Sequence, residues 1–524
     1  MSDRQPLPTL SVLTTVYNPL PAHLDECLVS VRSATTDIEH IVVDDASTDP
    51  DVHRRLDRVG PHVRLVRRAA NGGICAATAD ALAAATNEWL VFLDHDDVLA
   101  DGALDELAAF IAQHPHAAAV YTDHDMIRPD GQRVEPVYKP DFSPERLRHT
   151  NYITHLLAVR GDIAIAVGGI RPGFDGAQDH DLLLRIAARG LPIEHLAKVL
   201  YHWRQSPASV ATDAAAKPYA YWSGQRAVAD HLASLGIAAE IDSADYAGVY
   251  RVRRHTERTP LVSVVIPTDG HRARVWGTTR TLAVEAIRSI ATSGTYQHLE
   301  FVVLADPDTP PEAIAMLRRV DDRVRVIEST AGGVHASIGD LVLLLADDTE
   351  LIAPDSIAVM VALLSDAPNP ADAAYGAVGA VGAKLLAEDG TICNAGYVVA
   401  GQPVAVCAGW PGDHPGPQRV LAIARECSAV SVAALMTTRA LLDEVIDLPA
   451  ATPTSIQLCS AIRAAGRRIL YTPDASWYQF GLAARPPNEH NTTPTDPYYN
   501  PNLTPGRGDW LELPNRSGAP PRYD

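Results

Sequence analysis

The chain has 524 residues, of which 47% are hydrophobic and 21% charged, and this length suits two or three globular domains of roughly 100–200 residues each. Its formal net charge of −20 disfavours binding to nucleic acid or to an anionic membrane surface. The sequence has no apolar run long enough for a transmembrane helix and no signal-peptide core at its start, so we expect a cytoplasmic protein, soluble or peripheral to the inner membrane face. The six cysteines are scattered without a CxxC motif, which is typical of buried thiols in a reducing compartment.

The first two apolar segments predict neighbouring strands of a parallel sheet. Residues 9–18 break into a loop after Thr15 and Tyr17, and residues 39–45 end in acids, among them Asp45. The carboxyl ends of parallel strands meet at one edge of a sheet. A tyrosine ring and a carboxylate there suit a nucleobase, although ordinary turn chemistry explains the same residues equally well.

A glycine-rich turn follows. The sequence Asn71-Gly72-Gly73 opens an alanine-rich segment that we expect to be helical. Backbone N–H groups at the start of a helix favour phosphate, so Gly73 is a candidate phosphate-binding residue. The same sequence is also an ordinary turn, and alone it does not decide between the two.

The next strand ends in a cluster of carboxylates. Residues 89–93 are continuously apolar, which is typical of a strand buried on both faces, and Asp94, Asp96 and Asp97 follow within four positions. Carboxylates this close repel one another unless a cation lies among them. Hard cations such as Mg²⁺ or Mn²⁺ take oxygen ligands. The alternative is that these acids cap the helix that begins near Gly102.

Further along, an amphipathic helical pattern begins at Asp179. Its carboxylate is a candidate general base for a hydroxyl group, although helix capping is the commoner role of an aspartate at such a position. In the segment after this helix, His202 is a candidate metal ligand and Arg204 a candidate phosphate contact. A lone histidine is more often structural, so the metal role of His202 depends on the residues around it.

The chain repeats itself. Residues 260–269, 300–309 and 343–348 repeat the first strand, the second strand and the acidic tip about 250 residues later, with Asp347 at the position of Asp96. A register kept across three motifs indicates a tandem duplication of one α/β domain with mostly parallel strands. We expect four parts: a first domain over 1–210, a helical connector over 211–258, a second domain over 259–485, and a Pro/Asn-rich arm over 486–524 that is draped or disordered.

These motifs, in this order, resemble the family 2 glycosyltransferases of the GT-A fold. The resemblance is close over residues 10–205. Within the family, the chain is similar to the tandem-domain bacterial type that builds cell-surface or O-antigen-type glycans. It implies inverting, metal-dependent transfer of a hexosyl or deoxyhexosyl group from a UDP- or dTDP-sugar, with Mn²⁺ or Mg²⁺ as cofactor. The acceptor it implies is a hydroxyl group on a glycan, a glycolipid or a protein.

The resemblance also gives roles to residues. It makes Asp179 the catalytic base, with Gln178 where relatives carry Glu. It gives the metal to Asp94 and Asp96, with His202 closing the site. Together with the two phosphate candidates above, the expected donor-binding set is Thr15, Tyr17, Asp45, Gly73, Asp94 and Arg204.

The second copy lacks parts of this pattern. Ser455 stands where relatives carry a carboxylate, Ala305 replaces the first acid after the second strand, and residues 329–340 are too short for the glycine-rich helix. We therefore expect a degenerate domain that positions the acceptor, stabilises the first copy or mediates homo-oligomerisation.

Two other functions compete with a glycosyltransferase. A sugar nucleotidyltransferase needs a Gly-rich basic loop after the first strand, which residues 15–20 lack. A non-catalytic glycan-binding protein would not need the complete set of polar residues in the first copy.

Overall fold

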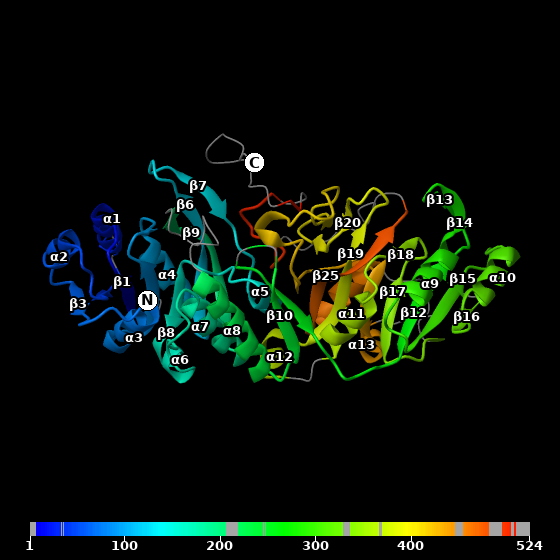
Figure 1. Cartoon of the computed structure of the whole chain (residues 1–524), viewed down its shortest axis with the longest axis horizontal. Helices are drawn as coiled ribbons and strands as arrows, with labels where there is room; N and C mark the ends of the chain where they lie inside the picture. The colour runs from blue at the N-terminus through cyan, green and yellow to red at the C-terminus, as the bar shows by residue number, and fades with distance from the viewer. Residues whose placement is uncertain are drawn as a thin grey trace, which may run out of the picture.

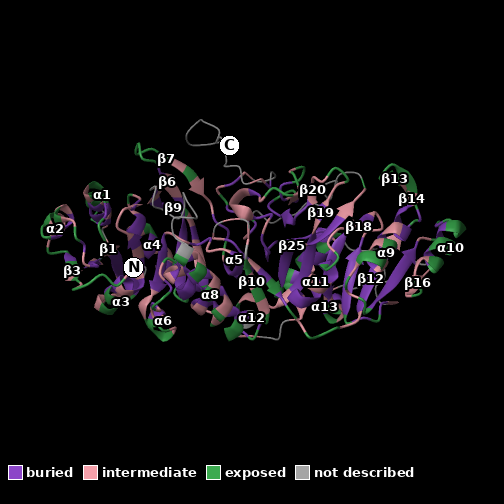
Figure 2. Ribbon diagram, in the orientation of Figure 1, coloured by how far each residue is buried: buried purple, intermediate pink, exposed green. Residues whose placement is uncertain are grey.

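The computed structural model describes residues 7–32, 34, 36–205, 218–244, 246, 248–327, 336–365, 369–445, 454–481, 495–504, 508 and 509. Two α/β domains lie side by side along the long axis of the molecule (Figure 1). Most strands of the two large sheets are buried (Figure 2). Among the helices of the described ranges, none has the length and apolarity that a membrane crossing demands.

The first domain is built on a 9-stranded sheet in the order β3-β2-β1-β4-β8-β6-β9-β5, with β7 paired to β6. Strands β3, β2, β1 and β4 are parallel, and β8 runs antiparallel to both of its neighbours. The strands are β1 Leu10–Val16, β2 Ile38–Asp44, β3 Val63–Arg67, β4 Trp89–Asp94, β5 Val98–Leu99, β6 Ala119–Ile127, β7 Arg133–Val137, β8 Leu157–Arg160 and β9 Ile193–Arg204. The helices are α1 Pro21–Val31, α2 Pro50–Leu56, α3 Ile74–Ala84, α4 Ala103–Gln113, α5 Pro144–His149, α6 Gly161–Ala166 and α7 Gln178–Ala188.

Strand β1 forms the centre of the candidate site. It pairs with β2 on one side and β4 on the other, so that Val16 lies opposite Asp44 and Thr15 lies opposite Asp94. Strand β4 is apolar up to Leu93 because both of its faces are covered. Its first polar residues therefore come where the strand leaves the core, at the same edge as the ends of β1 and β2.

The second domain repeats this topology. Its 10-stranded sheet has the order β16-β15-β12-β17-β24-β19-β25-β18, which matches the first sheet strand for strand. This confirms the expected fold class of two tandem α/β domains. The path strands are β12 Val262–Thr268, β15 Leu299–Ala305, β16 Val324–Ile327, β17 Leu341–Leu345, β18 Thr349–Leu351, β19 Val378–Leu386, β24 Ala434–Thr438 and β25 Arg468–Gln479, and β20 Ile392–Asn394 and β23 Arg425–Glu426 lie off it. The helices are α9 Leu282–Ser293, α10 Pro311–Val320, α11 Ser356–Leu364, α12 Pro370–Tyr375, α13 Arg439–Val445 and α14 Ser455–Ala464.

Small elements complete this domain. Two antiparallel hairpins stand apart from the large sheet, and a short 3-10 helix covers Pro417–Arg419. The hairpins are β13 Arg272–Val275 with β14 Thr278–Thr281, and β21 Tyr397–Val398 with β22 Val404–Ala405.

Strand register corrects how the two acidic tips correspond. Trp89 opens β4 opposite Leu10, and Leu341 opens β17 opposite Val262. Counting from these pairs, Asp348 occupies the position of Asp96, and the sequence comparison, which had placed Asp347 there, is wrong by one residue. The corresponding positions are Ala346 for Asp94, Asp348 for Asp96 and Thr349 for Asp97.

The connector is only partly helical. Helix α8, Pro218–Ser234, is followed by an antiparallel hairpin of β10, Ala239–Ser243, and β11, Tyr250–Arg254, which the helical expectation missed. The first residues of the expected connector, 211–217, lie outside the described residues. His231 joins α8 to the first domain, because its Nδ1–H donates to the Leu184 carbonyl at 2.9 Å and its Nε2 accepts from Arg148 Nε at 3.2 Å.

The two domains share buried polar contacts. Glu426 on β23 accepts hydrogen bonds from the Ser143 hydroxyl, the Glu145 N–H at 3.1 Å and Arg468 Nη1 at 2.8 Å. Such a carboxylate is tolerated in the interior because hydrogen bonds and one ion pair compensate its lost hydration. The interface is therefore specific and not a loose contact between two folded units.

The described part of the C-terminal arm, residues 495–504, packs on both domains. Asp496 accepts from the Ser428 hydroxyl and the Val399 N–H of the second domain, each at 2.7 Å. Asn500 donates to Asp123 Oδ2 of the first domain at 2.9 Å. This stretch is draped over the junction, and residues 486–494 of the expected arm lie outside the described residues.

We predict that acid weakens the attachment of α8 through His231. Burial, with the nearby charge of Arg148, lowers the pKa of His231 from its usual 6.5 to about 3. The unfolded chain therefore takes up a proton that the folded chain refuses, and the free energy of unfolding falls by up to ~1.4 kcal/mol per pH unit as pH drops from about 6.5 to about 3. His231→Gln keeps hydrogen-bonding capacity without this titration and should flatten the pH dependence of the urea midpoint. Equal slopes for the native chain and the variant would contradict the assignment.

Candidate functional site

A cavity of about 1660 Å³ opens at the carboxyl ends of β1, β2 and β4 and extends to α7, α8 and the β10–β11 loop. It collects all but one of the residues that the sequence predicted for the site. His202 is the exception. Those on its wall are Thr15, Tyr17, Asp45, Gly73, Asp94, Asp96, Asp179 and Arg204.

The loop after β1 presents an aromatic ring to this cavity. Tyr17 is 47% exposed and lies on the cavity wall. Asn18 fixes the loop, because its Oδ1 accepts from the N–H groups of Thr48 and Asp49 at 2.8 and 3.0 Å. The ends of β1 and β2 are thus tied together beside a ring that is open for stacking.

The start of α3 differs from the sequence expectation. Asp45 accepts hydrogen bonds from the N–H groups of Gly72 and Gly73, both at 2.9 Å, and from Arg68 Nη1 at 2.5 Å. Asp175 accepts from the Cys75 N–H at 3.2 Å. Carboxylates from this protein therefore cap the helix. The sequence made Gly73 a candidate phosphate-binding residue, but in the structure its N–H donates to Asp45.

The acidic turn after β4 is anchored by β9. Asp97 is buried and accepts from the Tyr201 hydroxyl at 2.5 Å and the Arg204 N–H at 2.7 Å. Burial, followed by repulsion from Asp94 and Asp96, raises the pKa of Asp97 well above its usual range. Arg204 Nε also donates to the Asp96 carbonyl at 2.8 Å. The turn thus brings three carboxylates together at an energetic cost that a cation would relieve.

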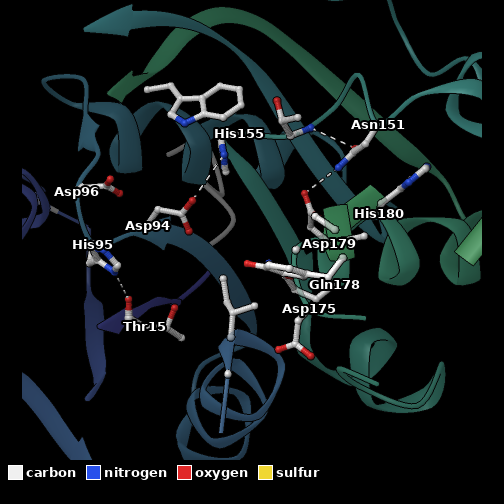
Figure 3. A pocket seen from close by; sticks show the side chains of 18 of the residues that line it. Thr15, Asp94, His95, Asp96, Asn151, His155, Asp175, Gln178, Asp179 and His180 are labelled. Carbon is white, nitrogen blue, oxygen red and sulfur yellow. Dashed lines mark hydrogen bonds and ion pairs between the residues drawn. The ribbon is translucent and has the colours of Figure 1, made fainter. Parts of the chain in front are cut away.

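His155 faces these carboxylates, and the sequence analysis had not assigned it a role. Its Nε2 lies 3.7 Å from Asp94 Oδ2 (Figure 3). Its ring stacks on Tyr201 with centroids 4.6 Å apart. Burial lowers the pKa of His155 to about 4, so the imidazole is neutral at neutral pH and has a lone pair to donate.

Three of these side chains could together hold a metal ion. Asp94, Asp97 and His155 offer ligand atoms that all lie within 4.8 Å of one another. The two carboxylates suit a hard cation such as Mn²⁺ or Mg²⁺, and the neutral imidazole adds a nitrogen ligand. Asp96 lies on the same cavity wall but outside this group.

His202 was expected to close the metal site, but it lies outside the group formed by Asp94, Asp97 and His155. Its Nδ1–H donates to Asp125 Oδ1 at 2.6 Å, and its Nε2 accepts from Arg133 Nη1 at 2.9 Å. Both ring nitrogens are therefore committed to the protein. The cause is strand pairing, since β9 places His202 opposite Asp125 of β6.

Asp179 lies on the far side of the cavity from the acidic turn (Figure 3). It is the second residue of α7, and Ala177 holds the N-cap position, so Asp179 is not the cap that the alternative interpretation required. Asn151 Nδ2 donates to Asp179 Oδ2 at 2.8 Å and orients the carboxylate. The helix N-terminus favours the charged form of an acid in its first turn.

A buried lysine supports the segment that carries both Asn151 and His155. Lys139 is fully buried, and its Nζ donates to the carbonyls of Thr122 at 2.6 Å, Ile153 at 2.5 Å and His155. Burial lowers the pKa of Lys139 to about 7, against the opposing effect of Asp123. The metal side and the Asp179 side of the cavity therefore share one support.

Part of the first domain matches a known family. Residues 11–173 match glycosyl transferase family 2. An uncharacterized protein of Sinorhizobium fredii is 36% identical over 96% of this chain and 58% of its own length. The O-antigen biosynthesis protein RfbC of Myxococcus xanthus is 33% identical over 95% of this chain and 40% of its own length. The chain thus spans about half the length of these curated relatives.

Among solved structures, the crystal structure of S. aureus TarS 1-349 aligns at 20% identity with a TM-score of 0.34. The alignment covers 43% of this chain and 65% of that one. This likeness is distant.

We predict that His155, and not His202, contributes to metal affinity. His155→Ala removes a ligand and should weaken Mn²⁺ binding about ten-fold or more, measured by calorimetry on the full chain. His202→Ala is the matched control, since its ring nitrogens face Asp125 and Arg133, and its effect should be clearly smaller. A larger loss in His202→Ala than in His155→Ala would reverse the assignment.

Proposed function

We propose that this chain, whose residues 11–173 match glycosyl transferase family 2, transfers a sugar from a nucleoside-diphosphate sugar to an acceptor hydroxyl group. The observation that carries the proposal is the cavity itself, in which the acidic turn at Asp94 and the carboxylate of Asp179 stand on opposite walls. UDP or dTDP is the proposed nucleotide, with Tyr17 beside the base. The name of the Myxococcus relative supports a bacterial cell-surface glycan as the product.

On the donor side, Asp94, Asp97 and His155 would hold Mn²⁺ or Mg²⁺, with Asp96 as a further candidate ligand. Such an ion, when bound, neutralises the charge that develops on a departing nucleoside diphosphate. Arg204 adds a guanidinium group to this wall, oriented by the Asp96 carbonyl at 2.8 Å and paired with the carboxylate of Glu26.

On the other side, Asp179 acts as the base. It takes the proton of the acceptor hydroxyl while the oxygen attacks the anomeric carbon from the face opposite the diphosphate. The new carbon–oxygen bond forms as the bond between sugar and diphosphate breaks, and the nucleoside diphosphate leaves. With Asp179 as base and no second carboxylate required as a nucleophile, a single displacement with inversion follows, by analogy with the carboxylate logic of glycosidases.

We predict that Asp179→Asn lowers turnover about 1000-fold, because the amide cannot accept the proton and general-base contributions are of order 10²–10⁴. Nucleotide binding should persist, since the variant leaves the β1, β2 and β4 ends unchanged. The assay is release of nucleoside diphosphate with acceptor present, and calorimetry with UDP and Mn²⁺ reports binding. Asp162→Asn, an exposed carboxylate on α6 paired with Arg160, is the control. Near-native turnover in Asp179→Asn would mean that another group is the base.

We further infer that the second domain does not catalyse transfer. Two of the acids of the first site are replaced there, by Ala346 and Thr349. Helix α14 starts at Ser455, whose Oγ accepts from the Val432 N–H at 3.1 Å, and the helix carries no carboxylate. One cluster of possible ligand atoms is present in the second domain. It consists of Asp269, His271 and Asp347, and two of these three residues are exposed.

A register-matched pair tests this inference. Asp96→Asn in the first domain should lower turnover at least about 100-fold, as expected for loss of charge at a metal site. Asp348 occupies the corresponding position in the second domain. The variant Asp348→Asn should leave turnover and product linkage unchanged. Loss of one linkage from the product of Asp348→Asn would establish a second active site.

A further inference from the structure

The cavity is larger than one ligand requires. Its volume of about 1660 Å³ exceeds the roughly 300–1,000 Å³ of a typical small-molecule site. The ends of β1, β2 and β4 line one part of it, and the connector lines the part beyond Asp179. A second ligand therefore has room on the connector side, next to the proposed base.

Five aromatic residues of the connector line the cavity, and three of them, Tyr219, Trp222 and Tyr246, carry the argument that follows. Tyr219 and Trp222 lie in the first turns of α8 and are 52% and 64% exposed, and Tyr246 lies in the β10–β11 loop. We call these three residues the connector wall. Large aromatic side chains that remain this exposed in a concave site are typical of ligand contacts rather than of a core.

The connector wall is held in place beside Asp179. A Cβ at Gly176 would lie 2.5 Å from the Cβ of Ala220, so the first turn of α8 packs directly on the loop that leads into α7. Tyr221 packs edge to face with Trp222 at 5.9 Å and contacts Tyr250 at 5.4 Å between ring centroids. The Arg419 guanidinium of the second domain lies 4.3 Å from the Tyr246 ring. Both domains therefore help to fix the wall.

The charge of this part of the cavity selects among ligands. Of the described residues that line the cavity, Arg204 alone carries a guanidinium or ammonium group, and it lies on the donor side. The Arg419 guanidinium lies behind this lining, on the Tyr246 ring, and is not among the residues that line the cavity. The connector side has the carboxylates of Asp175 and Asp179 and the amides of Asn151 and Gln178. Such a surface repels phosphate-rich or uronic-acid-rich chains and offers hydrogen bonds to hydroxyl groups.

We propose that the connector wall is the acceptor subsite and that it binds a neutral saccharide. The apolar C–H faces of sugar rings stack on the aromatic rings, and their hydroxyl groups bond to the amides and carboxylates, which places one hydroxyl at Asp179. This inference rests on the proposed function and adds to it the class of the acceptor and the part of the chain that selects it.

The test is binding of the full chain, with Mn²⁺ and UDP or dTDP, to an array of neutral oligosaccharides and of oligosaccharides that carry phosphate or uronic acid. The native chain should bind neutral members in preference. Trp222→Ala should weaken that binding about three- to ten-fold, the range expected for one aromatic stacking contact. Trp222→Phe keeps a ring and should recover most of it.

Trp276→Ala is the matched control, because this tryptophan is also exposed, at 39%, but lies on the β13–β14 hairpin of the second domain with its indole bonded to Glu350 at 2.9 Å. Calorimetry with UDP and Mn²⁺ shows whether each variant is folded. Preference for anionic members, no saccharide binding, or equal binding by Trp222→Ala would overturn the proposal. Saccharide binding that depends on Trp222 in a chain that binds neither UDP nor dTDP would keep the subsite and refute the proposed use of a UDP- or dTDP-sugar.

Discussion

The buried ammonium group of Lys139 holds together segments that reach the cavity from distant parts of the chain. Its three protons are all used by backbone carbonyls, those of Thr122, Ile153 and His155, and Asp123 balances its charge nearby. A buried charge is tolerated only when it is satisfied in this way, and leaving such carbonyls unpaired would be costly. The segment that carries the metal-side histidine and the partner of the base therefore has little freedom, which is what a site that must hold two substrates in fixed geometry requires.

The sequence was informative where the determinants were local. Apolar runs that end in Asp94 and a helical pattern that begins at Asp179 located both sides of the cavity, because strand ends and helix starts follow from neighbouring residues. The histidines were decided by distant pairing. His202 was expected at the metal, but β6 presents Asp125 to it, and His155 reaches Asp94 only because the chain folds back before β8. Neither contact leaves a signal in the local sequence.

The duplication was visible in the sequence, but its details were not. Motif comparison was out by one residue at the second acidic tip because two adjacent aspartates, Asp347 and Asp348, fit the pattern almost equally well. Hydrogen-bonded register removed the ambiguity. The β10–β11 hairpin was missed because short polar strands after a long helix carry little periodicity. The same register shows how a copied domain can keep every strand of its sheet while the positions at the strand ends, which carry chemistry and not packing, diverge.

The contact between Asn500 and Asp123 has a consequence for how the protein is made. A chain emerges from the ribosome from its N-terminus, and domains generally fold as they appear. The first domain is translated early, yet the amide that bonds Asp123 and the Lys139 carbonyl is supplied by a residue synthesised after the whole second sheet. The nascent first domain therefore lacks the hydrogen bonds from Asn500 to Asp123 and to the Lys139 carbonyl. It reaches its final form only after the arm has been synthesised. The final form of the first domain is in this sense coupled to synthesis of the arm.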